Sequence, residues 1–294
     1  MHAAIVAGIR AETWLRYPLW ALNTSDAMKE TFDALDLDGG RFGLTAKARK
    51  RYRDNFFYNE LADLATLFMY MDNERFRSKA LRFENEDALS EALRSGPGAI
   101  VAGFRLGAYV GLPWTLGGFG VPVLMIVGDD EFVRMAKELG EAFAPKASQP
   151  LTFIRAKDPL VLAKSQAVLN EGGIVSTLID LSPIEYEKTT EVELLGERLN
   201  VAYGLPYLAA VTGRQIVPAA ITRAKGPRFT LRFGEVIAPP GRDSASVREA
   251  TQRLYGALES IVRRFPDQWI GWQTLHAASG GGTGRSDLVD AALT

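Results

Sequence analysis

Cysteine is absent from the 294 residues of this chain, and histidine occurs only twice, at His2 and His276. Without cysteine the chain forms no disulfide, no thiolate metal site and no cysteine nucleophile. The two histidines lie near opposite ends of the sequence, so a histidine-rich metal site is excluded. A Ser-His-Asp triad would need His276 as its base. We therefore expect no metal site and no bound cofactor.

An excess of charge of one sign and a long apolar run are also missing. The 34 basic and 35 acidic residues leave a net charge of −1, so no overall field favours nucleic acid or an anionic membrane. Residues 3–22 are largely apolar, but Arg10, Glu12 and Arg16 interrupt them. No window reaches the roughly 18 uncharged residues that a membrane span needs. We expect a soluble, cytoplasmic protein with no nucleic-acid partner and at most peripheral contact with the inner membrane.

Short apolar runs alternate with helical patterns through most of the chain. This alternation predicts an α/β protein: a single domain with a mainly parallel central sheet flanked by helices. The expected division is an α/β domain over 1–276, with an N-terminal helical segment, and a flexible Gly/Ser-rich tail over 277–294. We expect strands at 78–83, 99–103, 121–127, 151–154, 174–179, 216–222 and 228–233. We expect helices at 1–23, 45–70, 86–94 (capped by Asn85), 109–119 (or an ordered loop), 131–143, 159–170, 203–212 and 247–265.

Five sequence blocks, in order between about residues 45 and 275, resemble the bacterial lipid A-type (lauroyl/myristoyl) acyltransferases of the lysophospholipid acyltransferase-like superfamily. The blocks are Ala99–Val110, Leu169–Asp180 (similar to LxxGGxVxxLxD), Glu193–Arg198, Pro206–Pro218 and Phe265–Trp272 (similar to HPxQWxW). The resemblance implies an acyltransferase-like fold. It also implies that the acyl group is delivered as a thioester, on CoA or on a phosphopantetheinyl carrier protein.

The resemblance fails at the residues that perform the family's chemistry. In the family, a His-x4-Asp/Glu motif supplies a histidine base, which deprotonates the acceptor hydroxyl, and an acid that orients it. Alignment on Gly107 places Arg105 at the histidine position and Val110 at the acid position. Arginine stays protonated near neutral pH and valine does not titrate, so neither side chain can replace its counterpart.

Arg105 and Asp180 are the candidate catalytic residues. Arg105 would recognise an anion such as a carboxylate, a phosphate or a developing oxyanion, or it would be a structural arginine paired with an acid. Asp180 follows a buried strand, where it would act as a base or an orienting carboxylate, or would cap the next turn.

Four further residues are candidates for substrate binding. Tyr109 would donate a hydrogen bond or belong to the core. Glu197 and Arg198 would cover a substrate cleft or form only a charged turn. Arg223 would bind a CoA or carrier-protein phosphate or lie in a solvated loop. Trp269 and Trp272 favour a core or rim role over a ligand site.

Two functions stay open from the sequence. The first is an atypical acyltransferase-fold enzyme acting on a thioester-bound acyl or aminoacyl group, with a nitrogen or intramolecular acceptor, in a biosynthetic accessory pathway. The second is a non-catalytic relative that binds an acyl group or a carrier protein. A third reading keeps the cleft but assigns it another reaction, with Asp180 as base and Arg105 as an anion clamp.

Overall fold

The computed structural model describes residues 80–128, 151–180, 188–224 and 228–272, together with Thr45, Lys47 and Leu275. Several sequence expectations lie outside these residues. They are the helices at 1–23, 45–70 and 131–143, and the boundary and tail after residue 276.

A seven-stranded sheet forms the centre of the structure, in the order β1-β9-β8-β2-β5-β3-β4. Adjacent strands run parallel except β8 and β9, which form an antiparallel pair. Central strand β2 is buried along nearly its whole length because helices cover both sheet faces. The strands are β1 (Leu81–Glu84), β2 (Ala99–Gly107), β3 (Val123–Val127), β4 (Leu151–Arg155), β5 (Ile174–Leu178), β8 (Ile216–Arg223) and β9 (Phe229–Phe233).

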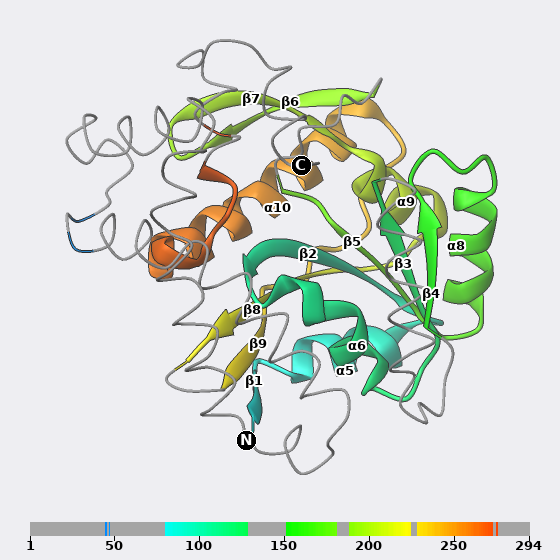
Figure 1. Cartoon of the computed structure of the whole chain (residues 1–294). Coiled ribbons are helices and arrows are strands. Elements are labelled where there is room, and N and C mark those ends of the chain that lie inside the picture. Colours follow the sequence, from blue (N-terminus) through cyan, green and yellow to red (C-terminus); the bar gives the residue numbers. More distant parts are fainter. Residues whose placement is uncertain are drawn as a thin grey trace.

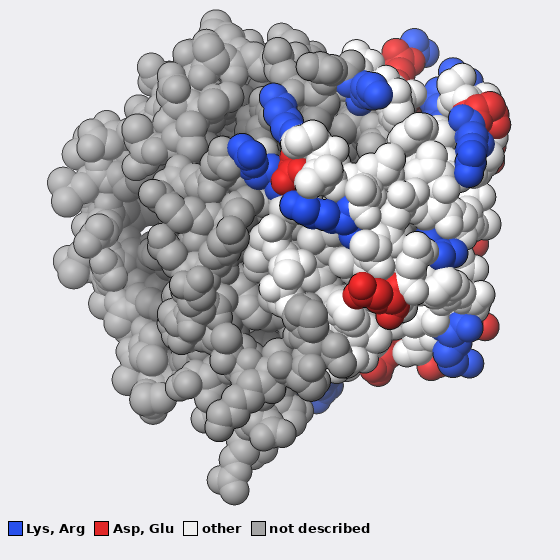
Figure 2. Space-filling model, turned by 90° about the vertical axis from the view of Figure 1, so that its right-hand side faces the viewer, with Lys and Arg blue, Asp and Glu red and all other residues white. Residues whose placement is uncertain are grey.

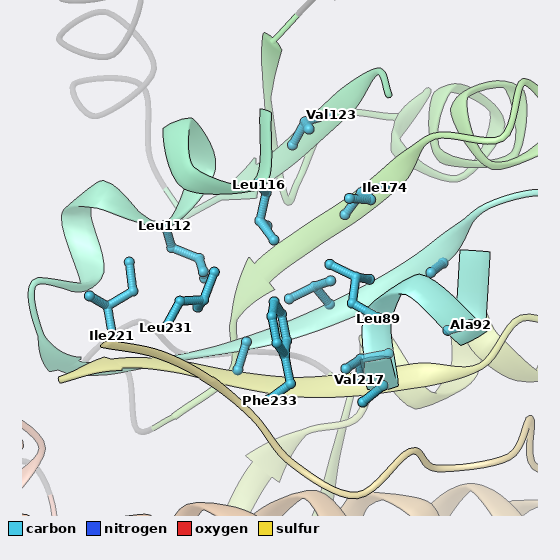
Figure 3. Packing of buried hydrophobic residues seen from close by; sticks show 14 of the residues in the cluster. Leu89, Ala92, Leu112, Leu116, Val123, Ile174, Val217, Ile221, Leu231 and Phe233 are labelled. Carbon is cyan, nitrogen blue, oxygen red and sulfur yellow. The ribbon is translucent and has the colours of Figure 1, made fainter. Parts of the chain in front are cut away.

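Helices α5 (Asp87–Ser95) and α6 (Leu112–Gly117) pack on one face of the sheet, and a short turn of 3-10 helix, η1 (Tyr109–Gly111), precedes α6. Figure 3 shows Leu89, Leu112 and Leu116 from this layer directed at strand residues such as Ile174. The other face is covered by α8 (Val161–Asn170), α9 (Gly204–Thr212) and α10 (Ser244–Arg264), through Leu169, Leu208 and Leu254 (Figure 1).

Local signals place both ends of α10. Asp243 caps α10, since its carboxylate accepts a hydrogen bond from the Ser246 amide at 2.9 Å. Pro266 ends the same helix and begins η2 (Pro266–Gln268). The prediction that Asn85 caps α5 is wrong. The N-cap is Glu86, without a side-chain bond, and the Asn85 amide instead donates to the Phe233 carbonyl at 3.3 Å.

A hairpin of β6 (Thr189–Leu194) and β7 (Glu197–Ala202) was not predicted; the sequence indicated only a turn. Its two turn residues, Leu195 and Gly196, have φ values of 54° and 82°, as a tight hairpin turn requires. Two side chains of α10 hold the hairpin. The Gln252 side chain accepts a hydrogen bond from the Glu193 amide and donates one to the Glu193 carbonyl. The Glu259 carboxylate accepts from the Leu195 amide at 2.8 Å. Figure 1 shows the hairpin lying along α10.

Among the described residues, no helix combines the length and apolar character needed to cross a membrane. Figure 2 shows the face that carries α8 and β4. Basic and acidic side chains both occur on it, with a broad uncharged area between them. This face therefore presents no continuous field of one sign.

Candidate functional site

Strands β2 and β5 are neighbours, but the chain leaves them toward opposite faces of the sheet. After β2 it forms η1 and α6 on the α5 face and then reaches β3. After β5 it goes through the hairpin to α9, on the other face, and then to β8. Ligands of open α/β sheets bind at such reversals, beyond the carboxyl ends of the strands. Arg105 is the third residue from the end of β2, and Asp180 follows the end of β5 by two residues, so both lie at this edge of the sheet.

The structure joins Arg105 and Asp180 directly. The Arg105 amide donates to Asp180 Oδ2 at 3.0 Å, and its Nε donates to Oδ1 at 3.4 Å. The Arg105 Nη2 also donates to the Asp180 carbonyl oxygen at 3.1 Å. The Arg105 side chain is 20% exposed, whereas that of Asp180 is fully buried. The Asp180 carboxylate therefore holds the guanidinium from the buried side, and Arg105 is the member of the pair that retains contact with solvent.

Trp269 completes the environment of Asp180. Its indole nitrogen donates to Asp180 Oδ2 at 3.0 Å, and Trp269 has no exposed surface. Both carboxylate oxygens thus accept hydrogen bonds. The carboxylate of Asp180 therefore has hydrogen-bond donors on both oxygens and is placed to orient the Arg105 guanidinium.

The backbone around this pair is fixed by several contacts. The β2 register shifts between Gly103 and Gly107, where the strand bends. Gly107 has a φ of 60°, and a Cβ at this position would meet the carbonyl oxygen of Ile221, so the bend needs glycine. The Ile270 amide donates to the Arg105 carbonyl at 3.2 Å. On the other strand, the Tyr255 hydroxyl donates to the Ile179 carbonyl at 2.7 Å.

Two other candidate residues lie at the same edge of the sheet. Tyr109, half-buried, begins η1 directly after β2. Arg223 is the last residue of β8, the strand beside β2. Gln268 fixes the Arg223 backbone, accepting from its amide at 2.7 Å and donating to its carbonyl at 3.2 Å.

Glu197 and Arg198 lie in a separate two-stranded sheet, at the start of β7 in the hairpin on α10. Glu197 is half-buried, and exposed Arg198 stands opposite Glu193 in the hairpin register. These two residues belong to a different layer from the strand ends that carry Arg105 and Asp180.

Residues missed as site members come from the segment after α10. Trp269 was expected only to fill the core or rim, and its burial confirms that role, but its bond to Asp180 was not foreseen. Gln268 was not considered. The only signal in the sequence was that the Phe265–Trp272 block resembles the end of the family sequences. That resemblance does not indicate which residues Gln268 and Trp269 contact.

Among the described residues, no three His, Asp or Glu side chains gather in a way that could hold a metal ion. Comparison with protein-family models finds no family that matches this chain, and comparison with curated proteins finds no relative. The site must therefore be interpreted from its own geometry.

Proposed function

We propose that this protein is an acyltransferase-like enzyme of atypical active site. It would move an acyl or aminoacyl group from a thioester, on CoA or on a phosphopantetheinyl carrier protein, to a nitrogen nucleophile or an intramolecular acceptor. One observation carries the proposal: Asp180 fixes the Arg105 guanidinium at the point where the chain leaves β2 and β5 toward opposite faces.

Arg105 would stabilise negative charge in this scheme. Its Nη1 makes no hydrogen bond to any residue that the structure describes, while Nε and Nη2 are held by Asp180. A guanidinium fixed in this way needs little reorganisation when a thioester carbonyl becomes an oxyanion. The same nitrogen would suit a substrate carboxylate or phosphate.

The nature of the acceptor follows from the part of the chain that the structure describes, in which no free base lies beside Arg105. A hydroxyl must lose a proton in order to attack, and Asp180 is enclosed by its hydrogen bonds. A neutral amine or hydroxylamine attacks with its free lone pair. The C–N bond forms, the C–S bond breaks, and the leaving thiolate takes up the proton that the nitrogen loses. Orientation contributes roughly 7–11 kcal/mol, which offsets the roughly 10²- to 10⁴-fold that a general base supplies.

The test is to incubate the full chain with acyl and aminoacyl thioesters, on CoA and on a carrier protein, and to compare amine, hydroxylamine and alcohol acceptors. We expect transfer to nitrogen and none to a sugar hydroxyl. Arg105→Ala should lower kcat by about 10²-fold or more, as loss of an oxyanion donor does. Arg248→Ala, an exposed arginine of α10, is the matched control and should leave the rate unchanged. Robust transfer to a hydroxyl would contradict the proposal.

The non-catalytic alternative has its own supporting observation. Asp180 and Trp269, exposed by only 2% and 0%, fill the space behind Arg105. A protein that only binds the acyl group or the carrier would need no more than the outward guanidinium. Binding of the thioester without turnover, with any acceptor, would establish this alternative.

A further inference from the structure

A cavity lies between α10 and the face of the sheet formed by β8 and β9. Its volume is about 480 Å³, within the roughly 300–1,000 Å³ typical of small-molecule sites. Phe104 of β2 lines it. Neither Arg105 nor Asp180 lines it, so the cavity is distinct from the site at Arg105.

The lining of this cavity combines apolar and charged residues. Phe104, Ala220, Ala257 and Ile261 provide apolar surface from β2, β8 and α10. Gly256 also lines it, and a Cβ added there would meet nothing within 4 Å. A glycine inside a helix weakens that helix relative to alanine. Here it also leaves open space that a larger residue would occupy.

Two groups of charged residues line the cavity. Arg253 pairs with Glu235 at 4.0 Å, and eleven residues further along α10 Arg264 stands with Arg232 and Glu84. The single carboxylate of Glu84 pairs with both Arg232 and Arg264, the latter at 2.8 Å. One positive charge is left over, which suits a monoanion.

Arg232 and Arg264 are also held close to each other. Their guanidinium carbons lie 4.8 and 5.1 Å from the centre of the Phe265 ring. Arg232 Nη1 is buried and contacts the Glu84 carboxylate, and Arg232 Nε donates to the Thr222 hydroxyl at 2.9 Å. Burial, and then the charge of Arg264, lower the pKa of Arg232 below its ordinary value. An anion at this end would reduce the repulsion between the two guanidinium groups.

From this cavity the geometry points to a binding site for a small organic carboxylate with an apolar body, its carboxylate at Arg232 and Arg264 and its hydrocarbon part against Phe104 and Ile261. This site does not depend on the function proposed for Arg105.

Calorimetric titration of the full chain with hexanoate tests the inference, with hexanol as the neutral counterpart and hexyl phosphate as the other anion class. We expect hexanoate to bind at least about tenfold more tightly than hexanol, because a guanidinium–carboxylate hydrogen bond is charge-assisted. Arg264→Gln should remove that difference. Arg263→Gln is the matched control. Arg263 is the neighbouring α10 arginine, pairs with Glu259 and is not part of the lining. It should leave the affinity unchanged.

A second variant tests the apolar part. Gly256→Leu should abolish hexanoate binding by filling the open space, and it should fold because leucine favours a helix more than glycine does. Equal affinity for hexanoate and hexanol, or equal losses in Arg263→Gln and Arg264→Gln, would overturn the carboxylate site. Unchanged hexanoate binding in Gly256→Leu would show that the ligand binds outside this cavity. Tighter binding of hexyl phosphate than of hexanoate would overturn the assignment to carboxylates.

Discussion

The indole N–H of Trp269 donates a hydrogen bond to Asp180 Oδ2 over 3.0 Å, although 89 residues separate the two positions. The same oxygen accepts from the Arg105 amide, also at 3.0 Å. A buried carboxylate is costly unless hydrogen bonds and an opposite charge compensate for lost water. Here three donors from two segments of the chain provide that compensation, so the stability of the strand ends depends on the whole cluster.

Removing both partners of this cluster should cost less than the sum of the costs of removing each one alone. Asp180→Asn is expected to destabilise the fold by about 3 kcal/mol, since it leaves the Arg105 guanidinium without its counter-charge. The double variant with Arg105→Gln should lose less than the sum of the single variants, because residues in one network are not additive. Urea unfolding of the four proteins measures this coupling. Strict additivity would show that the pair contributes nothing as a pair. Lys164→Gln, which breaks the more exposed pair with Asp158, serves as a control with little effect.

Gly107→Ala should destabilise the protein and disturb the site together. The new methyl group would meet the Ile221 carbonyl, and φ at this position is 60°. The steric clash and the unfavourable φ together predict a loss of about 2 kcal/mol or more in the free energy of unfolding. Thermal unfolding checks the value. Gly117→Ala is the matched comparison, because a Cβ there meets nothing within 4 Å and its φ is not in the left-handed region. A Gly107→Ala variant as stable as Gly117→Ala would contradict this account of the bend.

Leu195→Asn should be destabilising although asparagine tolerates positive φ better than leucine does. The left-handed conformation costs leucine roughly 1–2 kcal/mol. Leu195 is only 5% exposed and packs in the core beside α10, where burial of its side chain contributes roughly 1.5–3 kcal/mol. Burial is the larger of the two effects, and asparagine would also place a polar amide in that core. The expected net loss is about 1 kcal/mol, measured by urea unfolding; a gain in stability would mean that backbone strain is the larger effect.

Glu259→Gln should make the stability of the protein less dependent on acid. Burial opposes ionisation of Glu259, but the hydrogen bond from the Leu195 amide and the pairing with Arg263 outweigh it and lower the pKa of this carboxyl. A lowered folded-state pKa stabilises the fold above the unfolded value of about 4.3, and that contribution is lost as pH falls through the folded pKa.

At pH 7 the native protein should therefore exceed the variant by about 1 kcal/mol. Unfolding curves measured from pH 7 down to pH 3 should show this gap closing below about pH 4.3. A gap that is constant over that range would exclude the charged form of Glu259 as its cause.

Local sequence determined most of the strands and helices near the centre of this protein. The apolar run at 99–103 predicted the start of β2, and the helical spacing at 247–265, ended by Pro266, predicted α10 within a few residues. These patterns suffice because burial repeats with the period of each element. The β6–β7 hairpin was missed because its turn includes Leu195, a residue that adopts positive φ only when tertiary burial compensates.

The sequence indicated which residues belong to the candidate site, but it did not indicate how their side chains are arranged. Arg105 and Asp180 could be selected because each stands near the end of a buried strand, and parallel strands bring such ends together. Whether they pair, and which of them meets solvent, depended on contacts between residues 75 apart and on Trp269, another 89 residues along the chain. Such contacts form only when the sheet has closed and α10 has packed, because no local periodicity encodes them. Tertiary structure alone thus decided that Asp180 is the buried member of the pair and Arg105 the partly exposed one.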